Sequence, residues 1–237
     1  MAMNLPKIST PEFSTKIPST GQEVRYRPFL VKEEKILLMA MEGNDQKEIT
    51  TSIMNLLESC VLDDIDMNTL ATFDIEHLFL RLRGKSVGEV IEFKLGHTDP
   101  KNPCQHRVDG KINIEDIGVI GEIKDPVIMI TEDVGIKVHY PCLADLDGIS
   151  DVGNSALMTI LTRCIDQIFD KDQVYADFSE AEVTEWVDSL DQKSFKKIAE
   201  FFNDMPKLSY TFKWKCPECG EEDEMVLEGL QSFFSLG

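Results

Sequence analysis

The sequence feature that most constrains the fold is a pair of cysteines near the C-terminus, Cys216 and Cys219, followed directly by Gly220. Two thiols separated by two residues provide half of a tetrahedral metal site, because structural zinc is held by four nitrogen or sulfur ligands. Gly220 can adopt the positive φ that a tight turn of this kind requires. The fold must therefore bring two further ligands to this turn from another part of the chain.

A second segment, more than a hundred residues earlier, resembles the first. The range 93–97 begins with the same Phe-Lys pair as the range 212–216, and a strand-like run follows each segment, over 108–114 and 224–227. These patterns predict two β-hairpins whose tips meet around one structural zinc ion. The predicted ligands are His97, Cys104, Cys216 and Cys219.

The tip of the first predicted hairpin departs from the usual ligand spacing. Six residues separate His97 from Cys104, whereas roughly two to four are usual, so residues 98–103 are expected to bulge out as a proline-containing loop. His106 is an alternative ligand to His97, and iron is an alternative metal to zinc. A simpler interpretation is that the two C-terminal cysteines are a vestigial or redox pair.

The charge of the chain limits the classes of partner. There are 24 Lys and Arg residues against 43 Asp and Glu residues, which gives a net charge of −19 at pH 7. A surface this acidic repels phosphate backbones, so a nucleic-acid partner is not expected. No signal sequence is recognisable, and no apolar run approaches the roughly 20 residues of a membrane-spanning helix, so no membrane association is expected either.

The remaining cysteines do not indicate catalysis. Without a secretion signal the thiols are expected to be reduced. Cys60 and Cys164 lie in apolar helical patterns and are predicted to be small core residues, while Cys142 has no assigned chemistry. The sequence has no Gly-rich phosphate loop, nucleophile elbow or zinc-protease motif, and four ligands would leave the metal no open position. We therefore expect neither an enzyme nor a small-molecule substrate.

The patterns along the chain predict one α+β domain after an extended arm. Four prolines exclude a continuous helix from residues 1–30, which are predicted to form the arm. Residues 31–237 are predicted to form a single domain with a mainly helical body and two hairpins that build a zinc-ribbon-like metal knuckle. Helices are expected within 31–83 and 154–204, and hairpins over 88–115, 126–140 and 208–228.

Several local signals sharpen these elements. Asp45 is a candidate N-cap for a helix that ends near Cys60, and the run from Ser179 to Glu182 is a capping box. Asp109-Gly110 is expected to mark a kink or bulge, and one amphipathic helix is predicted over 154–170. Trp214, Phe233 and Phe234 are expected to be packed.

Three segments together resemble a known family. They are the range 17–21 running into Tyr-Arg-Pro-Phe-Leu-Val-Lys-Glu-Glu-Lys at 26–35, the two knuckle hairpins, and Gly-Leu-Gln-Ser-Phe-Phe at 229–234. They resemble the baseplate hub proteins, also called baseplate hub assembly chaperones, of T-even-type contractile-tailed bacteriophages. One departure is that this chain has His97 and a distant Cys104 where a Cys-x-x-Cys is expected.

The resemblance implies a non-enzymatic structural or assembly role in the central hub of a phage tail baseplate. The implied partners are other hub and tail proteins, and the implied location is the host cytoplasm during assembly or the tail baseplate of the virion. The hairpin tips alone suggest a different function, a zinc-ribbon nucleic-acid-binding or regulatory protein. The net charge of −19 disfavours this alternative.

Overall fold

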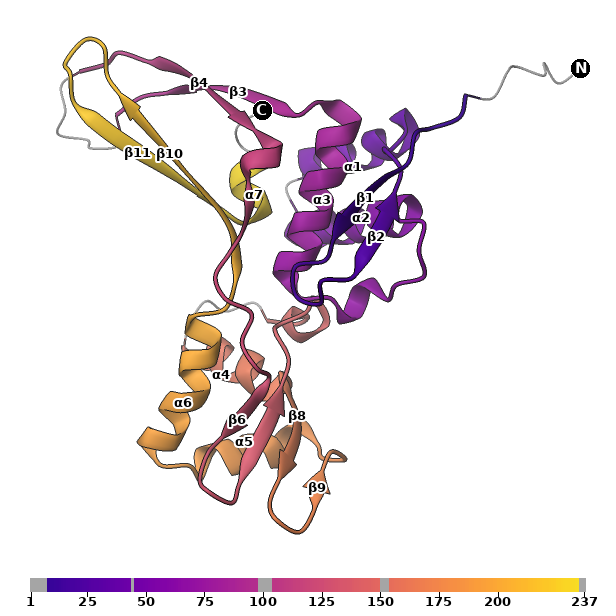
Figure 1. Ribbon diagram of the computed structural model, residues 1–237, viewed down its shortest axis with the longest axis vertical. Coiled ribbons are helices and arrows are strands. Elements are labelled where there is room, and N and C mark those ends of the chain that lie inside the picture. Colours follow the sequence, from indigo (N-terminus) through magenta and orange to yellow (C-terminus); the bar gives the residue numbers. More distant parts are fainter. Residues whose placement is uncertain (1–7, 44, 98–103, 150–153, 235–237) are drawn as a thin grey trace, which may run out of the picture. The chain divides into compact units, whose positions relative to one another are not determined.

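A computed structural model of the chain describes residues 8–43, 45–97, 104–149 and 154–234 (Figure 1). Internal contacts divide the chain into two compact units. The first unit comprises Met1–Met67, Asp74–Val119 and Leu208–Gly237, and the second comprises Asn68–Phe73 and Ile120–Lys207. Both units combine helices with small antiparallel sheets, which confirms the predicted α+β class. Within the described ranges, no helix is long and apolar enough to cross a membrane.

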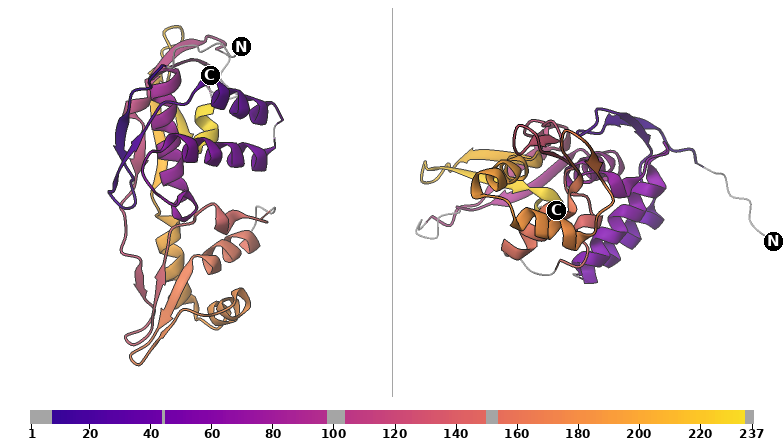
Figure 2. Two further views of the ribbon diagram at one scale, coloured as in Figure 1. Left: turned by 90° about the vertical axis from the view of Figure 1, so that its right-hand side faces the viewer. Right: turned by 90° about the horizontal axis from the view of Figure 1, so that it is seen from below.

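Three helices follow the N-terminal strands along the chain and precede the first predicted knuckle hairpin: α1 (Val31–Gly43), α2 (Gln46–Cys60) and α3 (Thr72–Val87), with the 3₁₀ turn η1 (Met67–Thr69) before α3. The predicted N-cap of α2 is confirmed, because the Asp45 carboxylate accepts hydrogen bonds from the backbone amides of Lys47 and Glu48. Helices α1 and α2 lie side by side (Figure 2). The buried residues of α2 recur at helical spacing, namely Ile53, Leu56, Leu57 and Cys60.

The N-terminal segment forms a packed hairpin where the sequence indicated an extended arm. Strands β1 (Phe13–Lys16) and β2 (Glu23–Tyr26) pair antiparallel, and Gly21 in the connecting turn has φ +70°. Ile17 is only 1% exposed and Val24 is fully buried. The prolines do break helical structure here, but they leave room for short strands whose apolar side chains reach the core. The division into an arm over 1–30 and one domain over 31–237 stays a prediction.

Two antiparallel strand pairs make up most of the remainder of the first unit. Strand β3 (Val90–Leu95) pairs with β4 (Val108–Asn113), which leads into the 3₁₀ turn η2 (Ile114–Asp116). Strand β10 (Lys207–Lys215) lies between β11 (Glu222–Glu228) and β5 (Gly118–Ile120). Both pairs contribute to one apolar core, which includes Leu80 of α3, Phe93, Ile112, Trp214 and Leu227. The expected packing of Trp214 is therefore confirmed.

Gly110 lies in a regular stretch of β4, directly opposite Phe93, so the bulge expected at Asp109-Gly110 is wrong. A Cβ atom at position 110 would overlap the ring of Phe93. The close approach of an aromatic ring thus explains the glycine. The sequence alone cannot distinguish a glycine of this kind from one that marks a bulge.

The short helix α7 (Gly229–Phe234) follows β11 directly. Gly229 begins it with φ +67°, and the amide of Leu230 donates to Glu76 Oε1 of α3 at 3.3 Å. Phe233 and Phe234 are expected to be packed, but their side chains are not among those that the structure describes.

The second unit contains a four-stranded antiparallel sheet in the order β6 (Val127–Met129), β7 (Gly135–Val138), β8 (Ile165–Phe169) and β9 (Val174–Tyr175). The 3₁₀ turn η3 (Ala144–Leu146) and the helices α4 (Asn154–Arg163), α5 (Glu180–Asp188) and α6 (Gln192–Asn203) complete the unit. Its core joins Ile136 and Ile165 from the sheet to Val183, Ile198 and Phe201 from the helices. The predicted capping box at Ser179 and Glu182 is present at the start of α5.

The helix expected over 154–170 ends at Arg163, and the next residues form strand β8. Ile168 of β8 lies opposite Ile136 of β7, and Ile165 is buried in the core. Pairing along β7 and burial of β-branched side chains outweigh the helical periodicity of the segment. The sequence pattern contains the helical periodicity but not the pairing with β7, which involves residues far away in the chain.

Candidate metal centre

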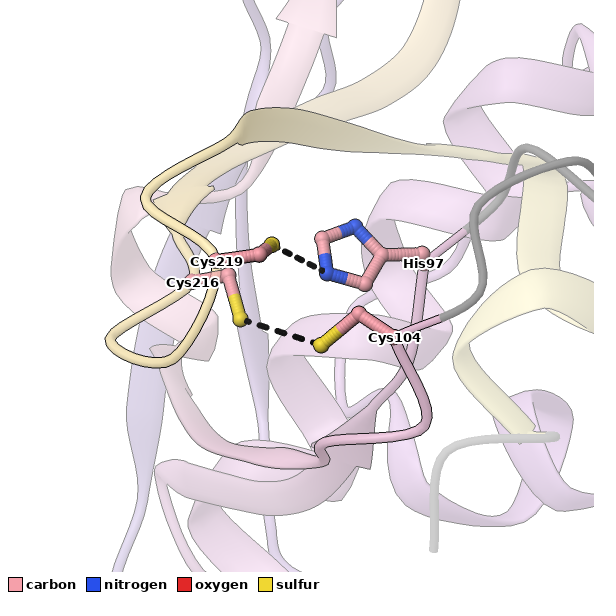
Figure 3. Close-up of side chains that lie close together, drawn as sticks. All are labelled: His97, Cys104, Cys216 and Cys219. Atoms are coloured by element: carbon pink, nitrogen blue, oxygen red, sulfur yellow. Dashed lines mark hydrogen bonds between the residues drawn. The ribbon is translucent and has the colours of Figure 1, made fainter.

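The tips of two hairpins meet at the four residues singled out in the sequence. Strand β3 delivers His97 just beyond Leu95, and Cys104 precedes β4. Cys216 and Cys219 lie in the turn between β10 and β11, where Gly220 has φ +76° and its amide donates to the Cys216 carbonyl at 2.9 Å. Figure 3 shows the four side chains pointing toward one another. The expected bulge over residues 98–103 lies outside the described residues.

The donor atoms lie at distances suited to a shared metal ion. The Sγ atoms of Cys104 and Cys216 are 3.8 Å apart, and Cys219 Sγ lies 3.3 Å from His97 Nε2. One donor atom from each of the four residues falls within 4.8 Å of all the others. With Zn–S bonds of about 2.3 Å and Zn–N bonds of about 2.0 Å, a tetrahedron has S···S edges near 3.8 Å and S···N edges near 3.5 Å. The arrangement therefore fits tetrahedral zinc.

The turn around Cys216 stabilises a thiolate. The backbone amide of Cys219 is the main cause that lowers the pKa of Cys216 to about 6, and the amide of Glu218 and the ring of His97 act in the same direction. The pKa of Cys104 is shifted in the opposite direction. The His106 amide lowers this pKa, but burial and the neighbouring Cys216 and Cys219 thiols together raise it above its usual value. One thiolate beside one thiol is the charge state in which the S···S contact of 3.8 Å is favourable.

Two groups beyond the four candidate ligands lie against the His97 ring. Asp223 Oδ2 of β11 lies 3.6 Å from His97 Nδ1, on the side of the ring away from Cys219. The Trp214 ring centroid lies 5.0 Å from that of His97, and Trp214 is buried. A carboxylate behind a metal-ligating histidine fixes the ring and raises its basicity. Sequence reasoning missed Asp223, because it is one of four consecutive acidic residues and only the strand register singles it out.

His106, the alternative ligand, is not part of this cluster. Its Nδ1 lies 3.1 Å from Glu218 Oε2, and its side chain is 36% exposed. Among the described residues, His97 is the histidine that shares the cluster with the three cysteines.

Cys60 and Cys164, the two predicted core cysteines, are not part of the cluster. Cys60 and Cys164 are fully buried. Burial raises the pKa of Cys60 to about 11, and it also raises the pKa of Cys164. Both are therefore neutral thiols at physiological pH, as expected for core residues.

Comparison with known protein families gives one match, which covers residues 10–235 and is described as T4 bacteriophage base plate protein. Searches of curated proteins and of solved structures gave no match. The match spans the β3–β4 and β10–β11 hairpins and both compact units, so it applies to the whole fold and not to one motif. The family is one of structural phage proteins, which agrees with the expected non-enzymatic role. The chain therefore belongs to the T4 bacteriophage base plate protein family.

Proposed function

We propose that this protein is a non-enzymatic component of the central hub of a contractile phage baseplate, where it acts as a structural subunit or assembly chaperone. The observation that carries the proposal is the family match over residues 10–235. The run Tyr-Arg-Pro-Phe-Leu-Val-Lys-Glu-Glu-Lys at 26–35, which resembles hub proteins, supports the hub in preference to other parts of the baseplate. Its partners are other hub and tail proteins, met in the host cytoplasm during assembly or in the virion tail.

The second part of the proposal is that one zinc ion, bound by His97, Cys104, Cys216 and Cys219, has a structural role. Four protein donors fill a tetrahedral ion, so no position remains for substrate or activated water. The ligands come from hairpins more than a hundred residues apart in the chain. The ion would therefore cross-link β3–β4 to β10–β11 and add its binding free energy to the stability of the first unit.

The hub role is tested by purifying the tagged protein from infected cells and identifying what accompanies it at each stage of tail assembly. We expect hub and tail proteins in the early intermediates. Recovery with DNA or RNA and without tail proteins would instead favour the zinc-ribbon alternative. A gel-shift assay at low salt checks that outcome separately, and a protein with a net charge of −19 should show no shift.

The ligand set is tested with two histidine variants. His97→Gln should lower the zinc content measured by elemental analysis by one equivalent, because Gln cannot replace the imidazole donor next to Cys219. His106→Gln is the matched control, since this residue is nearby but pairs with Glu218. Equal zinc content in both variants and in the unmodified protein would contradict the proposed ligand set.

A further inference from the structure

A second cluster of potential metal ligands lies in the second unit, in the segment that follows β7. His139, Cys142 and Asp145 each offer one donor atom, and these atoms all lie within 4.8 Å of one another. The residues are spaced three apart, which matches the close ligand spacing of metal-binding turns. The cluster shares no residue with the four-ligand centre of the first unit.

Hydrogen bonds to the backbone of this segment hold it in place without a metal. The His139 amide donates to the Cys164 carbonyl at 3.0 Å, which ties the segment to the end of α4. Arg163 Nη1 donates to the Asp145 carbonyl at 2.9 Å, and the Cys142 amide donates to Asp145 Oδ2 at 2.8 Å. The donor atoms are therefore preorganised, and a metal would not need to fold the loop.

The donor distances and types suit zinc. His139 Nε2 lies 3.1 Å from Asp145 Oδ2, and bonds of about 2.0–2.1 Å from tetrahedral zinc give an N···O edge near 3.3 Å. A carboxylate has enough lone pairs to accept from the Cys142 amide and still bind an ion. Imidazole, thiolate and carboxylate are all ligands that zinc accepts.

The environment of His139 is that of a metal-ligating histidine. Its Nδ1 atom lies 2.8 Å from Asp166 Oδ1 of β8, so a proton on Nδ1 is donated to that carboxylate and Nε2 is directed toward Asp145. Cys142 and Asp145 are buried, at 7% and 9% exposed, whereas the His139 side chain is 34% exposed. An ion can therefore reach the cluster from solvent along the imidazole.

We propose that His139, Cys142 and Asp145 bind a second divalent metal ion of the zinc type, with water in the fourth position. Binding displaces the proton from the Cys142 thiol and any proton on His139 Nε2 to solvent, while Asp166 keeps the proton on Nδ1. The alternative is an imidazolium that bridges Asp145 and Asp166 with no metal at all. The two possibilities differ in the amount of metal that the protein holds.

Metal stoichiometry of the full-length protein tests the proposal. After loading with zinc and removal of excess, the unmodified protein should hold one equivalent more than Cys142→Ser. Cys60→Ala, a control at a buried thiol outside both clusters, should hold the same amount as the unmodified protein. The comparison is repeated in a Cys216→Ser background, which separates this site from the first centre. Unchanged zinc content in Cys142→Ser, in either background, would overturn the proposal.

A second variant keeps the test valid if Cys142→Ser folds poorly. Asp166 is a positioning residue at the surface, 41% exposed, so Asp166→Asn should fold normally and weaken zinc binding at this site about 10- to 100-fold in chelator competition. With Co²⁺ as the probe, the thiolate-to-cobalt absorption of this site should remain in Asp166→Asn but require more metal. An unchanged cobalt titration in this variant would favour the metal-free ion pair.

Discussion

At the scale of single residues, the environment of His97 includes an acidic side chain, Asp223, that is not one of the four candidate ligands. Asp223→Asn removes the charge 3.6 Å from His97 Nδ1 and should weaken zinc binding at the first centre about 10- to 100-fold, because the imidazole becomes less basic and less well oriented. Chelator competition measures the change. Glu224→Gln, the same change one residue along on an exposed side chain, should leave the affinity unaltered.

The environment of His77 in α3 predicts that the stability of the protein depends on pH. Burial is the main cause that lowers the pKa of His77 to about 4, and the nearby charge of Arg81 acts in the same direction. The ring contacts Thr15 Oγ1 through Nε2 at 3.1 Å, while Nδ1 is buried and has no hydrogen-bond partner among the described residues. A second proton on this ring would therefore be poorly solvated.

The free energy of unfolding should consequently fall in acid. An unfolded histidine has a pKa of about 6.5, so between about pH 6.5 and 4 the unfolded chain binds a proton that the folded one does not. The stabilisation is present above pH 6.5 and is lost as the pH falls toward 4, by on the order of 2–3 kcal/mol in total. Urea titrations at pH 7.5 and 5 measure it, and His77→Gln should show a smaller difference between them. An identical difference in both proteins would assign the effect to other groups.

At the scale of elements, the N-terminal hairpin is part of the fold of the first unit. Its contacts to α3 include the Ser19 amide, which donates to Asp74 Oδ1 at 2.9 Å, as well as Thr15 with His77. An arm that ordered only on docking would have left its apolar residues exposed. Here Ile17 and Val24 are part of the core, so we predict that the hairpin is needed for folding.

Alanine substitutions in this segment should separate the hairpin from the chain before it. Ile17→Ala removes a side chain that is 1% exposed and should destabilise the protein by roughly 2–5 kcal/mol. Ile8→Ala alters a side chain that is 92% exposed and should change the stability by less than about 0.5 kcal/mol. Denaturant unfolding compares them. Equal stability of the two variants would mean that the hairpin is not docked in solution.

At the scale of the whole molecule, the two compact units should respond separately to loss of the first metal centre. Cys216→Ser removes one of the four proposed ligands, whose ion would join the β3–β4 hairpin to the β10–β11 hairpin, so amide protection in these four strands should fall. Strands β7 and β8 belong to the other unit and have their own core, so their protection should change little. Hydrogen exchange measures both regions in one sample, and a uniform loss across both units would show that they unfold as one.

Much of this architecture is readable from local patterns. The caps at Asp45 and Ser179 follow from side chains that satisfy nearby amides, and the alternation in the ranges 90–95 and 222–228 follows from sheets with one buried face. Strand β8 could not be predicted in this way. Its residues have helical spacing as well as β-branched side chains, and only the neighbouring strand β7 selects between the two structures.

The sequence by itself determined that this chain has a pair of metal-type thiols, a recognisable set of helices and hairpins, and the segments by which it resembles phage baseplate proteins. These are properties of residue type and short spacing, which are fixed by the covalent chain. Only the tertiary structure decided that His97, and not His106, lies with the three predicted cysteines, and that His139 lies with Cys142 and Asp145. Strand register and loop anchoring place those donor atoms, and both depend on contacts between residues far apart in the sequence.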